Sequence, residues 1–240
     1  MALNIPSELA FVLDLLGFEW PQLDEDEIHR AAHMVRQFRD DLEGTIEQVG
    51  SRVNDDVPAA FSAKAAQSYT DGWNEAREQH MTQLMDLLDP AGTGIDLFAD
   101  AVLALKLKVI AELVITAAQI AAALAAAAFT FGLSAAANVA IIAARKKVLD
   151  IIVEEAIAAL IVQIAEMVID PLTNLAETVI LALMDAPVVV AAVGEVEAYQ
   201  TDFAALEQAA SDIDSSGSDQ ETIGQEFLGQ LSTLQISTAG

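Results

Sequence analysis

The fold is decided by residues 24–53, which read DEDEIHRAAHMVRQFRDDLEGTIEQVGSRV. Apolar residues recur there at steps of three and four from Ile28 to Val53, which is the pattern of one buried helix face. Asp24 is placed to cap the first turn, Glu27 to close a capping box, and the acids suit the positive end of the helix dipole. The stretch therefore predicts an amphipathic helix of about 28 residues, roughly 40 Å long.

A second amphipathic helix follows the first along the chain. The sequence NDDVP at residues 54–58 predicts a break, because proline and several turn-forming residues occur together. The next helix is expected over residues 58–88 and to end in DPAGTG at residues 89–94. Two matched helices joined by a short turn predict an antiparallel hairpin. A short helix over residues 7–16, ending at Gly17, is expected to precede it.

The third region is apolar and rich in alanine. From Leu113 to Ala144 the chain carries no charged residue, and TFGLS at residues 130–134 offers a break within the run. The run is long enough to span a bilayer, which takes roughly 20 residues. It is also what the central helices of a water-soluble bundle look like, and alanine gains little from lipid. A buried core is favoured, and insertion into a membrane stays the alternative.

These observations predict an all-α chain, with a long antiparallel hairpin and a bundle of Ala-rich apolar helices. The predicted parts are residues 1–94 for the hairpin with its short preceding helix, 95–212 for the bundle, and 213–240 for an acidic or polar tail or linker. A helix is expected over 195–212 and a turn at DSSGS, residues 214–218, with one short helix after it. Residues 232–240 are small and polar, and are expected to run out into solvent.

The composition excludes several classes of function. The chain has 240 residues and a formal net charge of −26, although 54% of its residues are hydrophobic. Such an acidic surface argues against binding to nucleic acid, which needs clustered Lys and Arg. The absence of cysteine excludes disulfides and thiolate chemistry. The first residues lack a basic segment and carry Glu8 and Asp14, so they do not form a Sec signal peptide.

No motif for catalysis, a cofactor or a metal emerges from the sequence. His29 and His33 lie one helical turn apart, but no HExxH motif surrounds them, and two solvated histidines are the better interpretation. The acids at residues 24–27 lack the spacing and the glycine of a calcium loop. Glycines form neither a P-loop nor a dinucleotide fingerprint. The prediction is therefore a non-enzymatic protein without catalytic residues or cofactor.

The most informative stretch is FSAKAAQSYTDGW at residues 61–73. It places the aromatic residues Phe61, Tyr69 and Trp73 beside small residues such as Ala63, at one end of the expected hairpin. Small residues let helices approach closely, and exposed aromatic residues anchor partners. Aromatic residues at helical spacing are equally often part of a core, so the pattern alone leaves both interpretations open.

The stretch resembles the turn and second helix of the WXG (Trp-x-Gly) helical-hairpin proteins, which are substrates of type VII secretion. Phe61 stands where that family has Trp, and Ala63 where it has Gly. The lead-in through Trp20 and Pro21 is similar to the start of WXG-like N-terminal domains of larger actinobacterial secreted proteins. Those include polymorphic toxins and a mycobacterial outer-membrane channel protein that carries an NAD-degrading toxin. The resemblance covers roughly residues 17–190.

The resemblance implies a trafficking and interaction domain of a type VII-secreted effector, with any toxic activity elsewhere. It would be exported without a signal peptide and would bind small WXG-family helical proteins and the secretion machinery. Its binding residues would be Trp20, Pro21, Phe61, Ala63, Tyr69 and Trp73. The family's export signal, Tyr-x-x-x-Asp/Glu, is absent, since Trp73 follows Tyr69 and Phe203 follows Tyr199 at that spacing. A pore or translocation domain inserting residues 113–144, or a self-assembling protein, is the alternative.

Overall fold

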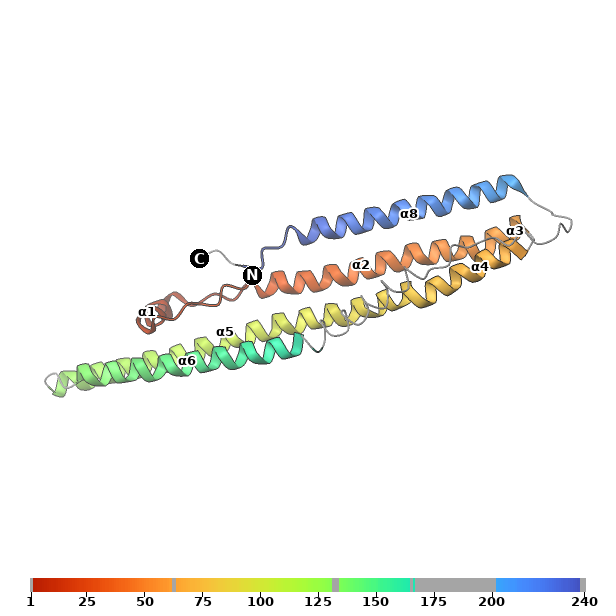
Figure 1. Cartoon of the computed structure of the whole chain (residues 1–240). Coiled ribbons are helices and arrows are strands. Elements are labelled where there is room, and N and C mark those ends of the chain that lie inside the picture. The colour runs from red at the N-terminus through yellow and green to blue at the C-terminus, as the bar shows by residue number, and fades with distance from the viewer. Residues whose placement is uncertain (1, 62–63, 131–133, 165, 167–201, 238–240) are drawn as a thin grey trace. The chain divides into compact units, whose positions relative to one another are not determined.

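The chain is almost entirely helical in a computed structural model, as the sequence predicts (Figure 1). The structure describes residues 2–61, 64–130, 134–164, 166 and 202–237. An isolated β-bridge pairs Leu23 with Ser237. The described residues form two compact units: residues 2–30, 94–166 and 235–237 make unit 1, and residues 31–93 and 202–234 make unit 2.

Unit 2 contains the antiparallel hairpin. Its first arm is the greater part of α2 (Glu25–Ser51), then η1 (Arg52–Asp56) and α3 (Val57–Ala60), and its second arm is α4 (Lys64–Ala76), η2 (Arg77–Met81) and the start of α5 (Thr82–Thr130). The arms are joined by paired amides, since the side chains of Asn54 and Asn74 exchange hydrogen bonds of 2.9 and 3.2 Å. The Thr70 hydroxyl also donates to the Val53 carbonyl at 3.2 Å. These contacts confirm the predicted hairpin.

The predicted break at residues 54–58 is wrong. The first arm stays helical to Ala60 through a π-helical turn, in which the backbone N–H of Val57 donates to the carbonyl of Arg52. Pro58 lies in the first turn of α3, where a missing N–H costs least. Burial of Val53 within the π-turn and of Val57 directly after it favours a continuous helix. The chain turns only at Phe61, whose backbone is extended.

The predicted end of the second helix at residues 89–94 is also wrong, because α5 continues through Pro90 to Thr130. The DPAGTG sequence forms a close helix crossing rather than a turn. A Cβ atom placed on Gly92 would come within 3.2 Å of Arg36 and 3.4 Å of the carbonyl oxygen of Ala32. Glycine therefore stands there because the two arms of the hairpin approach closely.

A third long helix, α8 (Phe203–Leu231), packs on the first arm of the hairpin. Asp202 caps its start by accepting hydrogen bonds of 3.1 Å from the backbone N–H groups of Ala204 and Ala205. The predicted turn at residues 214–218 is wrong, since the helix runs through it. The Ser216 and Ser218 hydroxyls donate back to carbonyls one turn earlier, at 2.9 and 3.3 Å. Of the helix predicted over 195–212, residues 195–201 lie outside the described residues.

Unit 1 is held by two apolar clusters. The larger joins α1 (Ser7–Leu16), α5 and α6 (Ser134–Ile164) around the fully buried side chains of Val109, Leu113 and Leu149. The smaller joins Ile28 of α2 to Ala99 and Val102 of α5. Helix α1 matches the predicted residues 7–16, and Gly17 ends it with a positive φ of 59° that suits glycine.

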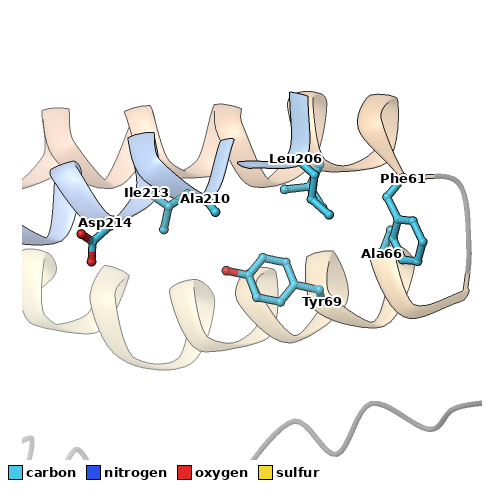
Figure 2. Close-up of a pocket in the computed structure, with 8 residues that line it drawn as sticks. Phe61, Ala66, Tyr69, Leu206, Ala210, Ile213 and Asp214 are labelled. Carbon is cyan, nitrogen blue, oxygen red and sulfur yellow. The ribbon is translucent and has the colours of Figure 1, made fainter. Parts of the chain in front are cut away.

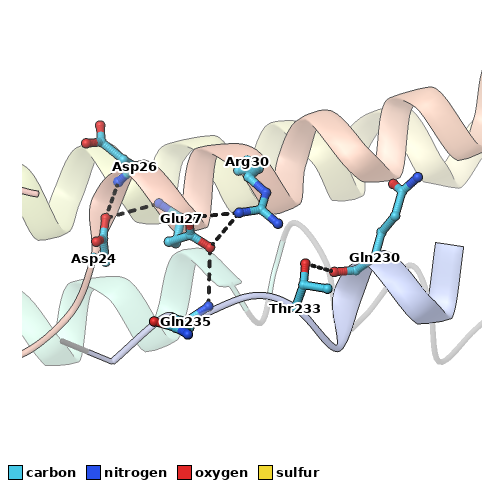
Figure 3. Close-up of polar contacts among 7 residues, drawn as sticks. All are labelled: Asp24, Asp26, Glu27, Arg30, Gln230, Thr233 and Gln235. Carbon is cyan, nitrogen blue, oxygen red and sulfur yellow. Dashed lines mark hydrogen bonds and ion pairs between the residues drawn. The ribbon is translucent and has the colours of Figure 1, made fainter. Parts of the chain in front are cut away.

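The segment before α2 is tied to residues near the C-terminus (Figure 3). Asp24 caps α2 as predicted, accepting from the N–H groups of Asp26 and Glu27 at 3.0 and 3.1 Å. The capping box does not close. The Asp24 N–H donates to the carbonyl of Ile236, and Glu27 pairs with Arg30 and accepts from the N–H of Gln235. The expectation that residues 232–240 run out into solvent is therefore wrong for residues 235–237.

The break predicted at residues 130–134, within the apolar run over residues 113–144, falls mainly on residues that the structure does not describe. Helix α5 ends at Thr130 and α6 begins at Ser134, while residues 131–133 lie outside the described residues. Within the described ranges, none of the helices combines the length and the hydropathy that crossing a bilayer requires.

Candidate partner-binding site

The turn end of the hairpin carries an apolar pocket of about 430 Å³ in unit 2 (Figure 2). The hairpin contributes Val57, Phe61, Ala66 and Tyr69, and α8 contributes Leu206, Ala210, Ile213 and Asp214. The pocket forms because Phe61 ends α3 in an extended conformation, so that α4 starts beside α8 rather than continuing the first arm. Its lining is the kind that accepts an apolar side chain with a polar group at its edge.

Two of the predicted binding residues share this pocket. Phe61 packs on a small cluster made by Val57, Ala66 and Ala209, so its ring is half-buried. Tyr69 is 42% exposed, and Figure 2 shows its ring between α4 and α8 with the hydroxyl pointing along the pocket. The structure thus brings Phe61 and Tyr69 together, with one ring held by the core and the other open to a partner. Ala63 lies outside the described residues.

Trp73 has a different place. It does not line the pocket, and its indole Nε1 lies 3.8 Å from where a Cβ atom on Gly50 would be. That nitrogen is buried without a hydrogen-bond partner among the described residues. Trp73 therefore packs between the two arms of the hairpin, where the missing side chain of Gly50 leaves room.

Trp20 and Pro21 belong to unit 1, not to the pocket. Trp20 packs against the larger cluster of unit 1, and the ammonium of Lys106 lies 5.9 Å from the centre of its ring. Pro21 is half-buried beside it in the sequence. Both residues precede α2, and they do not share a site with Phe61 and Tyr69.

Sequence reasoning missed the α8 side of the pocket. The turn expected at residues 214–218 divided a continuous apolar stripe, and so Leu206 and Ile213 were not recognised as one face with Ile223 and Phe227. The signal was present: Leu206, Ala209, Ile213, Ser216, Ile223 and Phe227 follow one another at helical steps. Further along this stripe the Phe227 ring stacks on that of Phe38, with centroids 4.4 Å apart.

Charges fix α8 to the hairpin at one point beside the pocket. Arg52 pairs with Asp56 at 2.8 Å within the hairpin and with Asp212 of α8 at 3.4 Å. The hydrogen bond that Arg52 donates to Asp56 and the charge of Asp212 raise the pKa of Arg52 above its usual range. All three groups are at least partly exposed, so water and salt weaken the attraction between them.

Unit 1 holds a contrasting polar cluster that is fully enclosed. Lys106 is 0% exposed, and its ammonium donates at 2.6 Å both to Glu25 Oε2 and to the Leu23 carbonyl. The other Glu25 oxygen accepts from the backbone N–H of Leu3. Burial alone would raise the pKa of Glu25, but the bonds from Lys106 and Leu3 outweigh it, so the pKa lies below its ordinary value. This cluster holds the segment before α2 in place.

Among the described residues, no group of three or more His, Asp or Glu side chains is arranged to hold a metal ion. His29 contacts Asp96 at 2.8 Å and Asp100 at 3.5 Å, which pairs α2 with α5 inside unit 1. His29 is therefore a partly exposed histidine that links α2 to α5. The pocket at the turn end is therefore taken as the candidate site.

Comparison with known proteins gives one finding. A family model described as "WXG100 like domain" matches residues 8–146, which is more than half of the chain. No curated protein and no solved structure matches. The matched range includes α1 except for its first residue, both arms of the hairpin and the first turns of α6.

Proposed function

The chain belongs to the WXG100-like domain family, and from that premise we propose that it is a non-enzymatic trafficking and interaction domain of a type VII-secreted effector. It is recognised through helix-to-helix packing with small WXG partners of the secretion system. The observation that carries the proposal is the family match over residues 8–146, because it includes the whole hairpin with its turn. Localisation outside the cytoplasm, by a route without a signal peptide, is part of the same proposal.

The pocket supports this function because it offers a partner something to bind. Interfaces gain most of their binding energy from a few large side chains buried in pockets. Tyr69 is exposed beside a pocket of about 430 Å³ at the turn end of the hairpin. Exposed apolar surface of this kind on a soluble domain marks sites of interaction.

Helix α8 limits which surface a partner uses. It already covers one face of the hairpin, with Ala209 buried against Val57 and Ala66. A partner hairpin therefore meets three helices rather than a bare two-helix unit. The surface left for it includes the second arm around Tyr69.

Co-purification tests the proposal directly. The full chain is expressed with each small WXG100-type protein of its own secretion locus, and a stable complex is expected with at least one. Tyr69→Ala is expected to weaken that complex and lower export, while Tyr69→Phe keeps the ring and serves as the matched control. If none of the small proteins binds and Tyr69→Ala is exported normally, the proposed function is wrong.

Insertion into a membrane is the second candidate, and one observation favours it. Large apolar side chains on α5 and α6 are exposed, among them Val114, Leu124 and Val139. Burial of such a surface is favourable in a lipid environment as well as against a protein. Leakage of dye from liposomes at neutral and mildly acidic pH tests it. A monodisperse protein that causes no leakage under either condition would rule the pore out.

A further inference from the structure

The pocket in unit 2 has a shape that restricts its occupant. It lies between α4 and α8, with Phe61 at one end and Asp214 at the other (Figure 2). From Leu206 to Asp214 the α8 side extends over about two helical turns, roughly 12 Å. Ala66 and Ala210 leave room on both walls. This opening suits the side chains of one helix lying along it.

The pocket carries a negative charge at one of its two ends. Asp214 is exposed at its end, and within the described residues its carboxylate has no cationic partner. Helix α8 carries six acidic residues and no Lys or Arg, so its own surface offers no counter-charge. A carboxylate in such a field favours a cation brought by the partner.

The chain's own sequence offers a poorer occupant. Residues 167–201 include five acids and no Lys or Arg, so they lack the cation that Asp214 favours. A like charge placed beside Asp214 would be repelled. The complementary occupant is therefore a helix from another molecule with basic residues.

On these grounds we propose that the pocket takes a single amphipathic helix, with one large apolar side chain between Tyr69 and Leu206 and a Lys or Arg opposite Asp214. The inference rests on the proposed function and makes it more specific. The hairpin and α8 together present three helices, and the partner helix is the fourth. Helix α8 stays in place when the partner binds.

Stapled helical peptides of about 20 residues, long enough to stay helical, test the proposal as defined probes. One carries a Leu anchor with Lys four residues away on either side, and its twin has Glu in place of Lys. The Lys peptide is expected to bind the full chain about fivefold more tightly than the Glu twin, with a ratio that shrinks at high salt. Leu→Ala at the anchor is expected to cost about tenfold or more in affinity.

Variants of the chain locate the binding. Ala210→Trp fills the pocket from an exposed position on α8 and is expected to abolish peptide binding. Ala205→Trp places the same side chain on the same helix outside the pocket, and is expected to leave binding unchanged. Asp214→Asn is expected to remove the preference for Lys over Glu.

A covalent lock distinguishes docking beside α8 from displacement of α8. The chain has no cysteine, so Phe38→Cys with Phe227→Cys gives a unique pair for a short bis-maleimide. The cross-linked protein is expected to bind the Lys peptide as tightly as the same variant without cross-linker. Loss of binding on cross-linking would show displacement and overturn the proposal.

Three other results would overturn it as well: equal binding of the two peptides, no binding of either, or binding that survives Ala210→Trp. Each leaves the proposed function untouched, because that function is tested with folded small WXG100-type proteins. Conversely, failure of those proteins to bind would not change the peptide result.

Discussion

In unit 1 the helices pack around side chains that have no exposed surface, such as those of Val109 and Leu113. In unit 2, by contrast, few residues are buried along the seam, which is the line of contact between helix α8 and the hairpin. The buried residues of that seam on α8 are Ala209 and Ser216, which are small. The enclosed charge in unit 1 is fully paired, while Asp214 at the pocket of unit 2 is open to solvent. The same chain thus encloses its side chains in one region and leaves an open apolar pocket in the other, which we propose binds a partner.

The largest expected effect comes from Lys106 in unit 1. Lys106→Ala leaves Glu25 buried without its partner, and is expected to destabilise the protein by about 3–5 kcal/mol. Urea unfolding measures this change. The double variant Lys106→Met with Glu25→Gln is the control, because it removes both charges and is expected to recover much of the loss. If Lys106→Ala costs less than about 1 kcal/mol, the cluster does not hold unit 1 together.

The next effect compares one leucine from each unit. Leu113→Ala in the unit 1 core is expected to cost about 2–5 kcal/mol, because a fully buried side chain leaves a cavity. Leu206→Ala in the pocket of unit 2 is expected to cost about 1 kcal/mol or less, because that side chain is already half-exposed. Thermal and urea unfolding of both variants give the difference. Equal losses would break the contrast between the units.

The sequence predicts some of the helices and helix ends correctly and others wrongly. The cap at Asp24 and the helix ending at Gly17 are local features, and the sequence predicts both correctly. Pro90 and the serines after Asp214 mislead, because both signals normally end a helix. Tertiary contacts decide instead: the hairpin crossing at Gly92 keeps α5 continuous.

The site was predictable only in part, because local sequence signals indicate some of its residues and the fold decides the others. Phe61 and Tyr69 stand out as aromatic residues beside small ones, but nothing in one sequence shows that α8 supplies the other wall. Lys106 lies 81 positions from Glu25 in the chain, so their pairing depends on the fold rather than on spacing. Trp73 is of a residue type that often binds partners, but it packs between the two arms of the hairpin.

Acid is expected to weaken unit 1 through Glu25. Its pKa is lowered on folding, so its contribution to stability is full above the ordinary value of about 4.3 and is lost as the pH falls through the lowered pKa. Unfolding free energies of the protein and of Glu25→Gln are measured between about pH 6 and pH 3. The difference between the two unfolding free energies is expected to become smaller toward about pH 3. A difference that stays constant would contradict the assignment.

The smallest effect concerns the start of α8. Asp202→Ala removes the cap of this helix and is expected to cost about 1 kcal/mol, while Asp202→Asn keeps a capping oxygen and costs less. Hydrogen exchange of the first turns of α8 measures the change more sharply than global unfolding. Faster exchange in α8 with unchanged exchange in unit 1 is expected. Equal effects in both units would mean that they unfold together.

The central claim is that the open pocket of unit 2 binds a partner. Titration calorimetry of the chain with a small WXG100-type protein of its secretion locus, for the unaltered protein and for Tyr69→Ala and Tyr69→Phe, tests it most directly. The account predicts that Tyr69→Ala loses about tenfold or more in affinity and that Tyr69→Phe stays close to the unaltered protein. Equal affinity for all three, with the fold intact, would contradict it.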